Sequence, residues 1–177
     1  TLPQQAPIYR VSGTLIRSED IPTIDRDGMV LLVQSLLSDY HCQRLKDALQ
    51  VDAGYGHEEF GRFRVNVFHQ RGDLQAALRL IPPRVRVIRD LNLPPVIERI
   101  ASERRGLILV TGTTGSGKST TLASMINYVN EKFNKHVVTI EDPIEFIFKD
   151  RKSIVNQREI GVDTPNFIQA LKMAVRQ

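Results

Sequence analysis

The chain has 177 residues and a formal net charge of +4, with 41% apolar and 25% charged residues. This composition is typical of a globular protein with an apolar core, in one large domain or two small ones. No apolar run approaches the roughly 20 residues of a membrane-spanning helix, so we expect no membrane insertion. Cys42 is the only cysteine, which excludes an internal disulfide and a cysteine zinc site and is typical of a reducing, cytoplasmic compartment.

The first part of the chain mixes strand and helix patterns. The stretch "APIYRVSGTLI" (6–16) predicts two short strands joined by a tight turn. Apolar residues at helical spacing then predict a helix over 29–36 and a second helix that is capped by Asp39 and continues to Leu49. This part of the chain is therefore expected to be of the α+β class.

An antiparallel hairpin is predicted next, from "GRFRVNVF" (61–68) and the returning "LQAALRLI" (74–81). Alternation places one set of apolar side chains on a common buried face: Phe63, Val65, Val67, Leu74, Ala76, Leu78 and Leu80. The opposite face carries Arg62, Arg64 and Arg79. Two interpretations of that face are open, a solvated surface or an arginine-bearing surface that meets phosphate or an acidic partner.

A change in composition divides the chain in the middle. The stretch "IPPRVRVIRDLNLPP" holds four of the nine prolines, which predicts a linker over 83–95 between an N-terminal domain, 1–82, and a second domain, 96–177. Near the end, "DTPNFIQALKMAVRQ" predicts a helix with Thr164 as its N-cap and with no stop signal after it. We therefore expect the sequence to be a piece of a longer polypeptide, lacking the start of the first domain.

The predicted second domain has the sequence pattern of an α/β fold. The stretch "GLILVTG" (106–112) predicts a buried parallel strand, and a helix begins near Gly117. The stretch "HVVTIED" (136–142) predicts another buried strand, which ends in acidic residues. Strand, glycine loop, helix and strand together predict a βαβ unit with a right-handed crossover.

A phosphate-binding loop is predicted between the first strand and the helix, because Gly112, Gly117, Lys118 and Ser119 match G-x-x-x-x-G-K-[ST]. Glycines let backbone N–H groups converge on an anion, and the helix N-terminus adds about half a positive charge. Lys118 is expected to reach the β- and γ-phosphates of ATP, and the Ser119 hydroxyl to bind Mg²⁺. The predicted nucleotide-binding residues are Gly112, Thr113, Thr114, Gly115, Ser116, Gly117, Lys118, Ser119 and Thr120.

Acidic residues follow the second strand in "TIEDPIEF": Glu141, Asp142 and Glu145. If this strand lies beside the strand that precedes the phosphate loop, its carboxyl end opens onto the same crevice. A carboxylate there can orient or deprotonate the attacking water, or hold Mg²⁺ through water. The alternative is that these acids are merely solvated.

Four stretches resemble the secretion-type motor ATPases, and more narrowly the type IV pilus retraction motors of the PilT and PilU group. They are "GRFRVNVFHQRG", "GLILVTGTTGSGKSTTLASMINYVN", "TIEDPIEF" and "NQREIGVDTPNFIQAL", and the resemblance runs from about Pro7 to the final residue. It implies a small PAS-like α+β N-terminal domain and the first part of a RecA-like P-loop ATPase domain with a mainly parallel sheet. It also implies a cytoplasmic homo-hexamer, peripheral at the inner membrane, that contacts a pilus platform protein.

The resemblance implies residue roles as well. The acidic motif assigns the catalytic glutamate to Glu145, with Glu141 as the other candidate, and arginines on the N-terminal hairpin approach bound nucleotide, which makes Arg64 and Arg79 candidates. The implied reaction is ATP hydrolysis to ADP and phosphate, which drives pilus retraction and twitching motility. Walker B and the histidine box are expected beyond Gln177, so we expect the chain by itself not to turn over ATP.

Other functions remain open at this level. The protein could be a pilus assembly or type II secretion motor ATPase, a RecA-like nucleic-acid-binding protein, or a nucleotide sensor that does not hydrolyse ATP. Nucleic acid is not expected as a partner, because the hairpin lacks the interleaved aromatic residues that stack bases.

Overall fold

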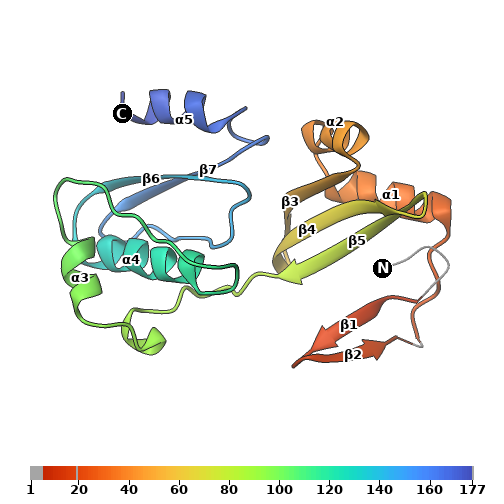
Figure 1. Ribbon diagram of the computed structural model, residues 1–177, viewed down its shortest axis with the longest axis horizontal. Helices are drawn as coiled ribbons and strands as arrows, with labels where there is room; N and C mark the ends of the chain where they lie inside the picture. Colours follow the sequence, from red (N-terminus) through yellow and green to blue (C-terminus); the bar gives the residue numbers. More distant parts are fainter. Residues whose placement is uncertain (1–5, 19, 177) are drawn as a thin grey trace. The chain divides into compact units, whose positions relative to one another are not determined.

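The computed structural model describes residues 6–18 and 20–176. The chain divides into two units, Thr1–Ile81 and Pro82–Gln177, and each has sheets of its own (Figure 1). Strand pairs are antiparallel in the first unit and parallel in the second. The predicted fold class, an α+β part followed by an α/β part with parallel pairing, is therefore confirmed.

The first unit contains two antiparallel sheets and two helices. Its elements are β1 (Ile8–Val11), β2 (Thr14–Arg17), α1 (Arg26–Leu36), α2 (Asp39–Ala48), β3 (Gln50–His57), β4 (Gly61–Gln70) and β5 (Asp73–Leu80). The β1–β2 hairpin turns at Ser12 and Gly13, both at positive φ, as the sequence predicts. The larger sheet has the order β3-β4-β5. It contains the predicted β4–β5 hairpin, whereas β3 was not predicted from the sequence.

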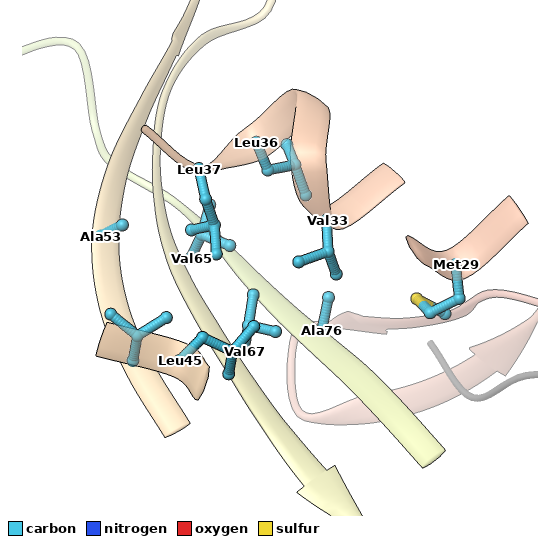
Figure 2. Close-up of a cluster of buried hydrophobic side chains, with 10 residues drawn as sticks. Met29, Val33, Leu36, Leu37, Leu45, Ala53, Val65, Val67 and Ala76 are labelled. Atoms are coloured by element: carbon cyan, nitrogen blue, oxygen red, sulfur yellow. The ribbon is translucent and has the colours of Figure 1, made fainter. Parts of the chain in front are cut away.

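The apolar core of this unit lies where α1 and α2 pack against one face of the larger sheet (Figure 2). Its buried members are Met29, Val33, Leu36, Leu37, Leu45, Val51, Ala53, Val65, Val67 and Ala76. Both the predicted helical stripe and the predicted alternation of β4 are confirmed. Leu78 and Leu80 lie opposite Val65 and Phe63 in the sheet, yet they are 45% and 57% exposed, so their predicted burial is wrong. Alternation assigns the face of a side chain but not how far that face is covered.

Helix α2 begins one residue earlier than predicted. Its N-cap is Ser38, whose hydroxyl accepts a hydrogen bond from the His41 N–H, and the predicted cap Asp39 is the first helical residue. An acid in the first turn is favoured by the helix dipole as well as at the cap, which makes the two positions hard to separate from sequence. Leu49 terminates the helix in the left-handed conformation and is exposed.

The second unit is built around a short parallel sheet. Its elements are η1 (Arg89–Leu91), α3 (Val96–Ala101), α4 (Lys118–Lys132), β6 (His136–Glu141), β7 (Ile154–Glu159) and α5 (Phe167–Ala174). Strands β6 and β7 pair in parallel, and α4 and α5 lie on opposite sides of them (Figure 1). The predicted linker, 83–95, falls within this unit, where Ile88 is buried. Its role as a hinge and the predicted domain bounds stay predictions.

Three sequence predictions for this unit are wrong. Residues 106–112 form no strand, and Leu107 and Leu109 are 83% and 75% exposed, because no other strand among the described residues pairs with this segment. The predicted βαβ unit is therefore absent from the described chain, and β6 pairs with β7 instead. Helix α5 is capped by Asn166 rather than Thr164, because the Asn166 side chain accepts a hydrogen bond from Gln169 N at 2.9 Å.

Across the part of the chain that the structure describes, no helix is both long and apolar enough to cross a membrane.

Candidate functional site

The predicted phosphate loop is a bend whose backbone requires glycine. Gly112, Gly115 and Gly117 have φ values of 149°, 80° and 92°, which L side chains rarely adopt. A Cβ on Gly112 would also lie 2.7 Å from the Ser116 hydroxyl oxygen. Helix α4 begins at Lys118, directly after the last of these glycines, so its N-terminal amides follow the bend without a break.

The Lys118 side chain folds back over this bend. Its Nζ donates hydrogen bonds to the carbonyl oxygens of Gly112 at 3.0 Å and Thr113 at 2.9 Å. These bonds hold a positive charge at the loop, where a phosphate group would require it. Residues 113–116 are exposed, and Thr120 lies half-buried in the first turn of α4.

A cavity of about 450 Å³ lies between the start of α4 and the end of β6. Ser119 lines it from the helix, and Glu141 and Glu145 line it from the end of β6 and the loop that follows. The other lining residues are Leu122, Ala123, Ile126, Val138, Thr139, Ile140, Asp142, Pro143, Phe146 and Phe148. The structure thus brings the predicted Mg²⁺ ligand and both candidate catalytic glutamates to one cavity.

This arrangement arises by a different route from the predicted one. The acids were expected at the cavity because their strand would pair with residues 106–112, which it does not. They reach the cavity because β6 and α4 form its two walls, with apolar side chains such as Leu122 and Ile126 on the helix side. The roles of Glu141 and Glu145 stay predictions.

The Glu141 carboxylate is held by side chains of the sheet. The Thr139 hydroxyl donates to Glu141 Oε1 at 2.6 Å, and Gln157 Nε2 donates to the same oxygen at 3.1 Å. Gln157, on β7, was not among the predicted site residues. All four residues of "NQRE" (156–159) are polar, so no alternation singles out Gln157, and its contact with Glu141 depends on the pairing of β6 with β7.

The two candidate arginines belong to the first unit. Arg64 on β4 lies directly opposite Arg79 on β5, on the face of the sheet that points away from the core. Arg64 Nε also lies 3.4 Å from the Asp52 carboxylate, in a partly exposed ion pair. That these arginines approach nucleotide stays a prediction.

No group of three or more His, Cys, Asp and Glu side chains within residues 6–18 and 20–176 is arranged to hold a metal ion. Ser119 remains the predicted Mg²⁺ ligand.

The comparisons with known proteins identify the family. A family model described as "Type II/IV secretion system protein" matches residues 59–177. The chain belongs to this family. Its relatives include a twitching motility protein of Neisseria gonorrhoeae, 41% identical over 97% of this chain and 46% of that protein. The type IV pilus retraction ATPase PilT of Pseudomonas aeruginosa is 39% identical over 97% of this chain and 49% of that protein.

A solved structure of the pilus retraction motor PilT with bound ADP superimposes with a TM-score of 0.87 and 46% identity, over 98% of this chain and 51% of that one. This member of the type II/IV secretion system family therefore spans about half the length of the curated relatives it matches. The predicted resemblance to pilus retraction motors is confirmed.

Proposed function

We propose that this protein is an ATP-hydrolysing hexameric motor that powers type IV pilus retraction. The observation that carries the proposal is the single cavity that Ser119, Glu141 and Glu145 share at the start of α4. The relatives that are pilus retraction motors support retraction, rather than assembly, as the process that ATP hydrolysis drives. We place the protein in the cytoplasm, peripheral at the inner membrane, with a pilus platform protein as its partner.

The proposed reaction begins with the triphosphate of ATP at the loop before α4. Backbone N–H groups of the loop and the charge of Lys118 neutralise its oxygens. Glu145 aligns a water molecule for in-line attack on the γ-phosphorus and accepts its proton, and the β–γ bridging oxygen leaves with ADP. Glu141, whose carboxylate is fixed by Thr139 and Gln157, is the second candidate for this role.

The residues of the cavity also fit a magnesium ion. Mg²⁺ usually takes few protein oxygen ligands beside phosphate oxygens and water, and the Ser119 hydroxyl shares its cavity with carboxylates that can bind such water. When bound, the ion would neutralise charge that develops on the phosphate oxygens.

Motion would follow when hydrolysis changes what the arginine-bearing face contacts. In this proposal, Arg64 and Arg79 meet nucleotide, so hydrolysis and phosphate release weaken the hold on the arginine-bearing face. Residues 83–95 then act as a hinge, and a ring of such hinges moves the platform protein.

The test is steady-state ATPase activity and ATP binding by the full-length protein with Glu145→Gln. We expect kcat to fall by about 10²-fold or more, because a positioned general base contributes about 10²–10⁴-fold, while the Kd for ATP stays near the wild-type value. Glu103→Gln, an exposed acid outside the cavity, is the matched control.

Near-normal turnover by Glu145→Gln would remove that residue from the role, and Glu141→Gln would be measured next. A wild-type protein that binds ATP without turnover would instead be a sensor, and the proposal would fail. In cells, loss of a retraction motor leaves pili extended, whereas loss of an assembly motor leaves none.

A further inference from the structure

Four polar side chains share one face of the β6–β7 sheet. The parallel register places Thr139 beside Gln157, and Glu141 beside Glu159. Because side chains alternate along a strand, residues two apart point the same way, so the four form a compact polar block. The segment after β6, residues 142–148, carries Glu145 and makes hydrogen bonds to this block.

Gln157 uses both ends of its amide on this segment and on Glu141. Its Oε1 accepts from Phe148 N at 2.9 Å, and its Nε2 donates to Phe146 O at 2.7 Å and to Glu141 Oε1 at 3.1 Å. One side chain therefore links the backbone on the C-terminal side of Glu145 to the carboxylate of the other candidate glutamate.

Glu159 holds the other side of the same segment. It is only 2% exposed, and its Oε2 accepts a hydrogen bond from Ile144 N at 3.1 Å. Loss of this partner would leave a buried N–H unsatisfied, which is costly, so the bond holds Ile144 in place. Glu145 thus lies between anchored neighbours, Ile144 on one side and Phe146 on the other.

We propose that Gln157 and Glu159 are positioning residues that hold Glu145 and Glu141 in the geometry for attack on ATP. The inference rests on the proposed ATPase function. Both strand residues act through the loop and the Glu141 carboxylate and need not touch nucleotide themselves. A displacement of about 1 Å in a catalytic group can lower the rate about 10²-fold, so bonds at Ile144, Phe146 and Phe148 control the rate through geometry.

The first test is steady-state ATPase kinetics of the full-length protein with Gln157→Met, which keeps the volume and removes all three hydrogen bonds. We expect kcat to fall by about tenfold or more and KM for ATP to change by less than about threefold, because the lost geometry matters only in the transition state. The matched control is Asn156→Leu. Asn156 is the adjacent residue on β7, and its side-chain amide bonds to His136 instead of to residues 142–148. Its kcat should stay at the wild-type value.

A pH profile tests whether a proton donor at position 157 supports turnover. Gln157→Glu places a second carboxylate beside Glu141, and like charges at this distance favour uptake of a shared proton. A protonated Glu at position 157 can again donate to Glu141. The kcat ratio of Gln157→Glu to wild type should therefore rise as pH falls from about 8 to about 6. A ratio that stays constant over this pH range would contradict the positioning role.

Conservative rescue tests Glu159. The amide oxygen of Glu159→Gln can still accept from Ile144 N, whereas Glu159→Leu cannot, so the Gln variant should show at least about tenfold higher kcat than the Leu variant. Amide exchange provides a readout apart from turnover, since Phe148 N–H should exchange faster in Gln157→Met and Ile144 N–H faster in Glu159→Leu.

These outcomes distinguish the two proposals. A wild-type protein that does not hydrolyse ATP would refute the proposed function, and amide exchange would still report whether the strand residues anchor the loop. A wild-type protein that hydrolyses ATP while Gln157→Met keeps its kcat would overturn the positioning inference alone. If Gln157→Met fails to fold, the pH dependence of Gln157→Glu decides the matter.

Discussion

The two units differ in the kind of side chain that is fully buried inside each of them. In the first, the large side chains that are fully buried are apolar, Met29, Val65 and Val67, and they pack between helices and a three-stranded sheet. In the second, the fully buried side chains of greatest volume are polar. Asn130 donates to Lys149 O at 2.8 Å and accepts from Arg151 N at 3.1 Å, and Ser153 donates to Phe133 O at 2.6 Å.

This difference suits the second unit to a site whose groups need a fixed orientation. Apolar packing is non-directional and stabilises a fold without fixing single atoms. Hydrogen bonds fix the direction of each partner, and in the second unit those of Gln157 hold Phe146 and Phe148, which line the cavity. The same unit leaves Leu107 and Leu109 exposed, so apolar burial there is incomplete among the described residues.

The largest expected effect is on the apolar core. Met29 is fully buried, and Met29→Ala should lower the free energy of unfolding of the first unit by about 2–5 kcal/mol, through lost transfer energy and a cavity. Amide hydrogen exchange of β4 measures this local stability. Val30→Ala, on the exposed side of the same helix, should cost less than about 0.5 kcal/mol. Equal effects of the two would show that this core does not hold the unit.

The next expected effect is a loss of ATP affinity with little change in the stability of the fold. Lys118→Ala removes a charge whose hydrogen bonds go to the loop carbonyls of Gly112 and Thr113, so ATP affinity should fall by about 10²-fold, equivalent to about 2.7 kcal/mol. Isothermal titration of the full-length protein with ATP measures this loss, and thermal unfolding without nucleotide should change little. Lys132→Ala, at the other end of α4, is the control. Unchanged affinity in Lys118→Ala would separate the loop from phosphate binding.

The smallest effect is expected at the exposed apolar segment. Leu109→Ala in the 177-residue chain should change stability by less than about 0.5 kcal/mol, because the side chain is already 75% exposed. Denaturant unfolding of the chain measures this change. A destabilisation comparable to that of Met29→Ala would mean that residues 106–112 are packed in solution.

Side-chain periodicity and glycine positions predicted most of the helices, strands and turns that depend on nearby residues alone. The stripe of α1 and the alternation of β4 follow from side-chain periodicity. The turn of the β1–β2 hairpin and the start of α4 follow from glycine. Strand β3 was missed because Gly54 and Gly56 lower its strand propensity, although Val51, Ala53 and Tyr55 alternate along it.

Those patterns could not predict which strands distant in sequence pair with one another. A run such as 106–112 has the composition of a buried strand, but a strand forms only when another backbone supplies its hydrogen bonds. For the site, the glycine loop and the acids could be predicted from motifs. Gln157 and Glu159 could not, because their role depends on the β6–β7 register, which brings residues distant in sequence side by side.

In the proposed mechanism, the bend before α4 holds a triphosphate within reach of the acids at the end of β6. The most direct test is an experimental structure of the full-length protein with Mg²⁺ and a non-hydrolysable ATP analogue. We predict that the γ-phosphate lies at the cavity lined by Ser119, Glu141 and Glu145. An analogue bound away from the loop, or one whose γ-phosphate points out of that cavity, would contradict the account.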